Sequence, residues 1–262
     1  MRAAFFDLDK TVIAKASIPA FGRPLYRGGL INRRLVARAL VSQLIYVHLG
    51  ASEQKLARVR ESMLTLTKGW DQSQIREIVR EALEETVEPI IYAEALDLIE
   101  AHRAAGHRVY LVSASPEEIV EPLAEHLGVD GCIATRAVVD EDGRYAGEMD
   151  FYAYGPFKAE AMVALAEEQD IDLAESWAYS DSYTDLPMLE AVGHPVAVNP
   201  DRVLAKTAKE RGWEVMQFTK PVRLRDRVSV PSLPLTAMVA GGTAAAATGA
   251  LLAWRVARRP RS

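Results

Sequence analysis

Short apolar segments alternate along this chain with longer stretches that have helical periodicity. Five of the apolar segments have the length of a β-strand and are rich in aliphatic and aromatic residues. Strands that alternate with helices build a mostly parallel sheet whose faces the helices cover. The pattern therefore predicts an α/β fold, with a Rossmann-like parallel sheet core and helices on both faces. The expected strands are residues 3–6, 108–112, 132–134, 177–179 and 195–198.

Turn-forming residues mark the ends of several elements. We expect Ser115 and Pro116 to open a helix that ends near Gly128, because these residue types favour helix starts and stops. Pro122 lies inside that helix and has no backbone N–H to donate, so a kink or a split is predicted there. Residues 137–149 are expected to form a hairpin, with an Asp-Gly pair at its turn.

One long interval, residues 14–88, breaks the alternation. It contains no convincing strand but has helical stretches at 32–48 and 73–86. A helical module inserted directly after the first strand would lie above the carboxyl ends of the sheet, where open α/β folds bind their ligands. The expected organisation is an α/β core formed by 1–14 and 89–218, with an inserted helical module formed by 15–88.

Composition and charge narrow the class of protein. The 262 residues are 49% apolar and 26% charged, as in an ordinary folded protein, and the single Cys132 cannot form an internal disulfide. The net charge of -5 is unevenly spread: residues 219–262 contribute +7 and the first 218 residues carry -12. An acidic body argues against nucleic acid as the main partner.

The basic C-terminal region surrounds a run without charges. A linker at 219–234 precedes twenty uncharged residues at 235–254, which is the length needed to cross a bilayer. We therefore expect residues 235–257 to form an apolar helix that spans or associates with a membrane; a helix packed on the body or on a partner is the alternative. The N-terminus turns polar at residue 7 and does not resemble a signal peptide. These features predict a cytoplasmic catalytic domain tethered to the cell membrane by a single C-terminal span.

Two carboxylates follow the first predicted strand. Alternation within a strand would point Asp7 and Asp9 the same way, with Thr11 continuing that side if the chain stays extended. Carboxylate oxygens at an exposed strand end suit Mg²⁺. One carboxylate can also act as a nucleophile while its neighbour exchanges protons.

Polar residues recur where the later strands end. Ser113 ends the second strand just before a helix, an arrangement that favours anion binding. Lys158 begins a predicted helix at 158–168, where a cation opposes the helix dipole and so is explained by a ligand. Asp181 and Asp185 flank the turn after the fourth strand. Because parallel strands bring these ends to one edge, the four residues are expected to meet Asp7 and Asp9.

These motifs, in this order, resemble those of the haloacid dehalogenase superfamily, subfamily IB, the branch that includes phosphoserine phosphatases. The resemblance covers residues 1–218. It implies a Rossmann-like core with a small helical-bundle cap after the first strand, and Mg²⁺-dependent hydrolysis of a phosphomonoester. The motifs that carry it are Asp7-Leu8-Asp9-Lys10-Thr11, Leu111-Val112-Ser113-Ala114-Ser115, Lys158, and Asp181-Ser182-Tyr183-Thr184-Asp185.

The resemblance also implies residue roles. Asp7 would become an aspartyl phosphate, and Asp9 would be the general acid and base. Asp7, the backbone carbonyl of Asp9 and Asp181 would hold Mg²⁺. The remaining site residues would support them: Ser113 and Lys158 by binding phosphoryl oxygens, Thr11 by orienting the loop and the phosphoryl group, and Asp185 as a second shell around the metal.

Some positions depart from that family's pattern. Lys15, Ala16 and Ser17 offer no carboxylate for the amine of phosphoserine, which argues against phosphoserine itself. Arg58 or Arg60 could bind a substrate carboxylate or could lie on a solvated helix face. Three readings stay open: a phosphatase for a small-molecule or lipid-headgroup phosphate, a phosphotransferase, and a membrane-associated binding or regulatory protein. In the fourth motif Ser180 and Ser182 replace glycines, and Thr184 replaces an Asn.

Overall fold

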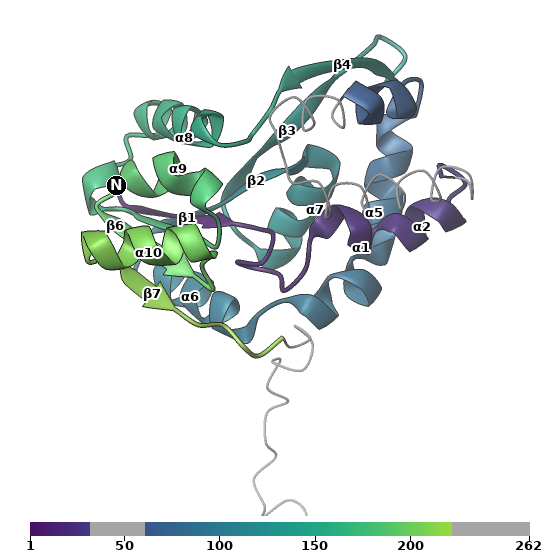
Figure 1. The fold of residues 1–262 in the computed structure, drawn as a ribbon. Helices are drawn as coiled ribbons and strands as arrows, with labels where there is room; N and C mark the ends of the chain where they lie inside the picture. The colour runs from purple at the N-terminus through teal and green to yellow at the C-terminus, as the bar shows by residue number, and fades with distance from the viewer. Residues whose placement is uncertain (32–60, 222–262) are drawn as a thin grey trace, which may run out of the picture. The chain divides into compact units, whose positions relative to one another are not determined.

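A computed structural model describes residues 1–31 and 61–221. Within them a seven-stranded sheet has the order β4-β3-β2-β1-β5-β6-β7 (Figure 1). All neighbouring strands are parallel except β3 and β4, which form an antiparallel hairpin. The strands are β1 (Ala3–Asp7), β2 (Arg108–Pro116), β3 (Gly131–Val139), β4 (Tyr145–Phe151), β5 (Trp177–Ser180), β6 (His194–Val198) and β7 (Glu214–Met216).

Helices cover both faces of this sheet. On one face α8 (Pro156–Glu168), α9 (Leu186–Glu190) and α10 (Arg202–Arg211) pack against side chains such as Phe5 and Val112. On the other, α6 (Ala93–Ala104) and α7 (Glu117–Leu127) cover side chains that alternate with those, such as Phe6. The predicted α/β fold is confirmed, and it buries β1 at the centre of the sheet.

All five predicted strands are present, and β2 and β3 run several residues beyond their predicted ends. β7 was not predicted, because its three residues show no buried face and two of them are exposed. It forms only by pairing with β6 at the edge of the sheet. The predicted hairpin is also observed, with Gly143 at φ 76° in its turn.

The helix after β2 differs from the prediction at its start. Ser115 belongs to β2, and Pro116 precedes the first helical residue without a side-chain cap. The hydroxyl of Ser115 instead bonds to Asp9, in the turn that follows β1. The helix is not split at Pro122: it runs without interruption from Glu117 to Leu127, with buried side chains before and after the proline. It ends as predicted at Gly128, which has the left-handed φ of 64°.

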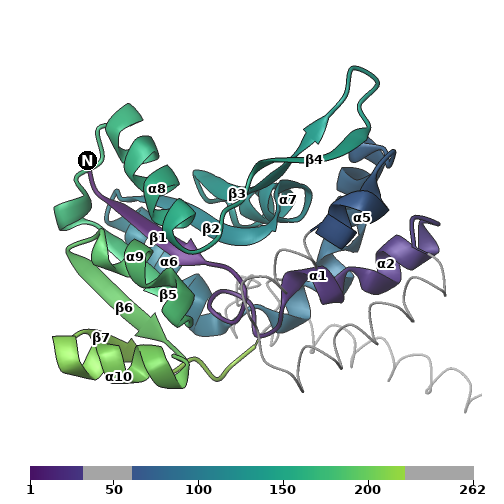
Figure 2. The same cartoon turned by 45° about the horizontal axis from the view of Figure 1, so that its top comes forward.

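The interval after β1 is helical where the structure describes it. It contains α1 (Ser17–Ala20), α2 (Gly22–Arg27) and α5 (Gln72–Thr86), and α5 confirms the predicted stretch 73–86. The predicted helix at 32–48 lies outside the described residues. Figure 2 shows α5 beside α7 and the β3–β4 hairpin. Two backbone hydrogen bonds join the start of α5 and the loop before it to that hairpin. They run from Gly69 N–H to Tyr145 O (2.8 Å) and from Gln72 N–H to Gly143 O (3.0 Å).

The predicted C-terminal helix at 235–257 lies outside the described residues, as does the linker beyond Pro221. In the part of the chain that the structure describes, no helix is both long enough and apolar enough to cross a bilayer.

A buried histidine lies under the sheet on the α6 side. His102 Nε2 lies 2.8 Å from the hydroxyl of Tyr179, and His102 Nδ1 lies 2.9 Å from Nδ1 of His107. Burial, with a smaller contribution from His107, lowers the pKa of His102 from 6.5 to about 4. The folded protein therefore keeps this imidazole neutral at pH values where an unfolded chain would protonate it.

This shift predicts an acid-labile fold. Between pH 6.5 and pH 4 the unfolded state binds more protons at His102 than the folded state does, so the free energy of unfolding should fall by about 2 kcal/mol as the pH drops through that range. Urea unfolding at pH 7.5 and 4.5 measures the change. His102→Gln should reduce the difference between the two pH values, whereas His194→Gln, at an exposed histidine, should retain it. A His102→Gln variant with the wild-type difference would contradict the assignment.

Candidate active site

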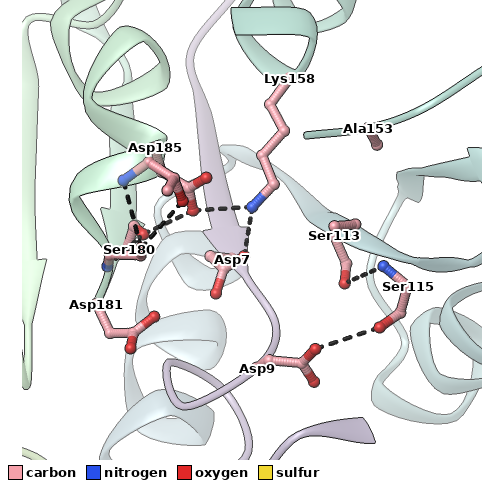
Figure 3. Close-up of polar contacts among 12 residues, drawn as sticks. Asp7, Asp9, Ser113, Ser115, Ala153, Lys158, Ser180, Asp181 and Asp185 are labelled. Carbon is pink, nitrogen blue, oxygen red and sulfur yellow. Dashed lines mark hydrogen bonds and ion pairs between the residues drawn. The ribbon is translucent and has the colours of Figure 1, made fainter. Parts of the chain in front are cut away.

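The residues expected to carry chemistry lie at the carboxyl edge of the sheet (Figure 3). β1 ends at Asp7, β2 carries Ser113 near its end, and Asp181 directly follows β5. β2 and β5 are the two parallel neighbours of β1, so these strand ends lie side by side. Strand order therefore brings together, at this edge, residues that lie up to about 170 positions apart in the sequence.

A buried lysine is the centre of the site. Lys158, in the first turn of α8, places its ammonium 2.6 Å from Asp7 Oδ1 and 2.8 Å from Asp185 Oδ2. All three side chains are almost completely buried, at 3%, 6% and 2% exposure. The hydroxyl of Ser180 donates a further hydrogen bond of 2.8 Å to Asp185 Oδ2. The lysine therefore sits between two carboxylates in a region shielded from water.

The carboxylate of Asp185 accepts hydrogen bonds from Lys158 and Ser180. Its expected role as a second shell around the metal stays a prediction. Asp185 lies at the end of η3 (Tyr183–Asp185), which returns the chain toward α8. The geometry indicates that Asp185 holds the ammonium of Lys158 in place beside Asp7.

Negative charge exceeds positive charge in this buried region. Burial raises the pKa of Asp7, and the carboxylates of Asp185 and Asp181 raise it further, against the opposing effect of Lys158. Burial alone would lower the pKa of Lys158, but Asp7 and Asp185 outweigh burial and raise it, so the ammonium stays charged. One cation is insufficient to neutralise three adjacent carboxylates.

The excess of negative charge also affects Asp181. Burial, aided by Asp185, raises its pKa from 3.8 to about 6, although Lys10 lowers it. The ammonium of Lys10 lies 3.9 Å from Asp181 Oδ2 and is largely exposed. Lys10 itself has a left-handed φ of 66°, which is where the chain turns sharply after Asp9.

That turn corrects one expectation. The chain does not stay extended through Thr11, because the N–H groups of Val12 and Ile13 both bond back to Leu8 O at 3.0 Å. Thr11 is fully buried, and its hydroxyl has no hydrogen-bond partner among the residues that the structure describes.

The donors at this edge fit a hard divalent cation. The carboxylates of Asp7 and Asp181 face the same space in Figure 3, and both have raised pKa values that a nearby cation would lower. Within residues 1–31 and 61–221, no group of three or more Asp, Glu, His or Cys side chains could hold a metal by itself. Any such ion would therefore need backbone or external oxygens in addition to the two carboxylates.

Asp9 lies across the site from Lys158 and has its own partners. Asp9 Oδ1 accepts the backbone N–H of Ser17 at 2.7 Å, and Asp9 Oδ2 accepts the hydroxyl of Ser115 at 3.2 Å. The backbone N–H of Ser115 donates to the hydroxyl oxygen of Ser113 at 3.1 Å. Among the residues that the structure describes, the hydroxyl hydrogen of Ser113 has no acceptor, so it can donate to a ligand.

Sequence reasoning missed three residues of this constellation: Ser17, Ser115 and Ser180. Ser180 had a signal, because it stands where a glycine was expected, and its hydroxyl bonds to Asp185. Ser115 lies within a family motif but was assigned only to a helix start, and Ser17 had no signal, because their contact with Asp9 arises only when the segment after β1 folds against the end of β2. Arg58 and Arg60, expected as possible carboxylate ligands, lie outside the described residues.

This chain is similar to proteins of one hydrolase family. The family described as haloacid dehalogenase-like hydrolase matches residues 4–190. A Streptomyces azureus protein named inhibition of morphological differentiation protein is 50% identical over 260 residues, covering 98% of this chain and 94% of that protein. A Mycobacterium tuberculosis phosphoserine phosphatase is 35% identical over 248 residues, covering 93% and 79%. A solved Bordetella pertussis protein of unknown function superposes with a TM-score of 0.71 at 29% identity, covering 82% and 97%.

The buried charge network yields a stability prediction. Lys158→Met leaves Asp7 and Asp185 without their cation, and it should lower the free energy of unfolding by about 3–5 kcal/mol, measured in urea with EDTA present. Adding Asp185→Asn should recover part of that loss, because it removes one of the unpaired charges.

Lys206→Met is the matched control. Lys206 is 77% exposed and lies 3.7 Å from Glu210, so its removal should cost no more than about 0.5 kcal/mol. Equal effects of the two lysine substitutions would show that the buried network contributes no special stability.

Proposed function

This chain belongs to the haloacid dehalogenase-like hydrolases, and from that premise we propose that it is a phosphatase that hydrolyses a phosphomonoester in a Mg²⁺-dependent reaction through an aspartyl phosphate on Asp7. The observation that carries the proposal is the contact of Asp7 with the buried ammonium of Lys158, which Asp185 holds from the other side. An ammonium fixed beside a carboxylate at a strand end is suited to bind the oxygens of a phosphoryl group while that carboxylate attacks phosphorus.

Asp7 would act first. One oxygen of its carboxylate forms a bond to phosphorus, and the bond from phosphorus to the alkoxy oxygen of the substrate breaks. Lys158 and Ser113 would neutralise and orient the phosphoryl oxygens, since phosphoryl transfer depends mainly on positioning and charge stabilisation. Thr11, whose buried hydroxyl lacks a partner among the described residues, would orient the loop that presents Asp7 and the phosphoryl group.

Asp9 would move the protons. It donates a proton to the departing alkoxide and then takes one from a water molecule, whose oxygen attacks the aspartyl phosphate. This second step releases inorganic phosphate and restores the carboxylate of Asp7. The two roles suit a carboxyl group that is not paired with Lys158, and the partners of Asp9 among the described residues are the neutral donors of Ser17 and Ser115.

Asp7, Asp181 and the backbone carbonyl of Asp9 would hold Mg²⁺. The bound ion would supply positive charge to the phosphoryl oxygens and lower the raised pKa values of the two carboxylates. In this proposal Asp185 acts through Lys158, because its carboxylate pairs with the ammonium and is held there by the hydroxyl of Ser180.

The substrate would be a small molecule or a lipid headgroup that carries one phosphomonoester. Phosphoserine is disfavoured although a phosphoserine phosphatase is 35% identical, because residues 15–17 offer no carboxylate for an amine. The backbone N–H of Ser17 donates to Asp9, so that position interacts with the proposed acid.

Activity assays test this proposal. The full-length chain should release phosphate from a panel that includes phosphoserine, glycerol phosphate and lysophosphatidate when Mg²⁺ is present, and EDTA should abolish release. Asp7→Asn should lower kcat by at least about 1,000-fold, because it removes the nucleophile. Asp172→Asn, at an aspartate that caps a surface turn, should retain wild-type turnover.

Other results would redirect the assignment. No turnover of any substrate by a folded chain that binds Mg²⁺ would favour a binding or regulatory protein. Transfer of phosphate to an added alcohol in preference to water would favour a phosphotransferase.

We further propose that residues 235–257 tether the catalytic body to the membrane, on the basis of their uncharged run and its basic flanks. The described chain ends at Pro221, where Ala93 N–H donates to Lys220 O at 2.8 Å and Glu94 accepts the N–H of Thr219 at 3.0 Å. The last described residues are therefore fixed to the start of α6.

Membrane fractionation tests the tether. The full-length chain should stay with membranes through a carbonate wash, and deletion of residues 231–262 should release it to the supernatant. A full-length chain recovered in the supernatant would instead favour the alternative in which this segment packs on the body or on a partner.

A further inference from the structure

Two buried serines next to Asp9 take no part in the chemistry described so far. Ser115 is 2% exposed and Ser17 is fully buried, and their hydroxyl oxygens lie 2.7 Å apart. Ser115 also donates to Asp9 Oδ2, and the backbone N–H of Ser17 donates to Asp9 Oδ1. Each oxygen of the Asp9 carboxylate thus has one fixed protein donor.

The number of hydroxyl hydrogens determines which group donates in each hydrogen bond of this cluster. The hydroxyl of Ser115 donates to Asp9 Oδ2, and this bond uses the single hydrogen that the hydroxyl carries. The contact between the two serines must then be a donation from Ser17 to Ser115. The result is a chain of hydrogen bonds from Ser17 through Ser115 to Asp9 Oδ2, in which each hydroxyl is oriented by the next group.

The backbone around Ser115 is fixed from two further sides. Its N–H donates to the hydroxyl oxygen of Ser113, and the carbonyl of Ala114 accepts a 2.8 Å bond from Thr135 on β3. The pairing of β2 with β3 shifts register between Ser113 and Pro116, which is where a bulge re-aims side chains. Ser115 is therefore held where its hydroxyl can reach across to Asp9.

Two fixed donors leave room for catalysis. Each carboxylate oxygen has two lone pairs, and the protein occupies one on each. A lone pair on each oxygen stays available for the proton that Asp9 exchanges with the substrate. The two donors come from segments 98 residues apart and set the plane of the carboxyl group.

From this geometry we infer that Ser115 is a positioning residue that orients the carboxyl group of Asp9 toward the leaving oxygen of the substrate, with Ser17 orienting Ser115. The inference rests on the proposed function, because it needs Asp9 to be the general acid. It concerns the direction of the carboxyl group and requires no contact between either serine and the substrate.

Leaving-group dependence tests this role. An alkoxide needs a proton as it leaves, whereas the weakly basic 4-nitrophenolate leaves without one. A misdirected Asp9 should therefore slow alkyl phosphates selectively. The parameter to compare is kcat/KM, since it reports the steps up to phosphoryl transfer to Asp7 and is independent of the later hydrolysis.

We expect Ser115→Ala to lower kcat/KM by about 10- to 100-fold for the best alkyl phosphate of the panel, a part of the 100- to 10,000-fold that general acid catalysis contributes. The loss for 4-nitrophenyl phosphate should stay below about threefold. Ser17→Ala should show the same selectivity with a smaller loss, and Ser115→Thr, which keeps a hydroxyl, should recover most of the activity. Asp9→Asn removes the acid completely and so gives the reference losses of kcat/KM on the two substrates.

Ser176→Ala is the matched control. Ser176 is a fully buried serine whose hydroxyl bonds to backbone groups away from the site. The variant therefore measures the effect of removing a buried hydroxyl that does not contact Asp9. It should lower the thermal midpoint without changing the ratio of the two kcat/KM values. If Ser115→Ala fails to fold, Ser17→Ala and Ser115→Thr still report that ratio.

Three results would overturn the inference: equal losses on both substrates, a rise in KM with unchanged kcat, or wild-type kinetics in Ser115→Ala. The failure of the proposed function looks different. A wild-type chain without turnover, or one whose turnover survives Asp7→Asn, would remove the phosphatase mechanism and this positioning role together.

Discussion

The contact of the Lys158 ammonium with Asp7 and Asp185 is the constraint around which the site is built. A lysine is costly to bury, and here two carboxylates at 2.6 and 2.8 Å compensate that cost. This contact constrains the three elements that carry the residues, α8, β1 and η3. The start of α8 must lie near the end of β1, and η3 must return the chain toward α8. The same contact places a fixed positive charge beside the carboxylate that we propose as the nucleophile.

The surplus negative charge around that lysine links stability to function. Burial raises the pKa of Asp7 and of Asp181, and neighbouring carboxylates raise both further around a single buried cation. Such an arrangement is tolerated when a ligand or ion completes the charge balance. In the proposed reaction the substrate phosphate and Mg²⁺ bring opposite charges to this region, which makes binding of one favourable for the other.

Asp9 is treated differently from Asp7 by its surroundings. Asp7 interacts with a cation, whereas Asp9 accepts bonds from neutral donors on Ser17 and Ser115. Ser17 is the first residue of α1, in the interval where the helical cap is expected, so the segment that leads into that interval contacts the acid directly. This arrangement ties the orientation of Asp9 to the local position of α1, and Ser17 lies outside the motifs that signalled the family.

The sequence by itself determined the five parallel strands, the helix at 73–86 and the identity of the main polar residues, because strand alternation, turn residues and short motifs are local properties of the chain. It did not determine β7, whose pairing depends on β6, or the turn after Asp9 that takes Thr11 out of the extended chain. Only the tertiary structure decided that Asp185 contacts Lys158 and that Ser17 and Ser115 meet at Asp9. Those contacts join residues from different elements, and their hydrogen bonds and burial arise only when strand order brings the segments together.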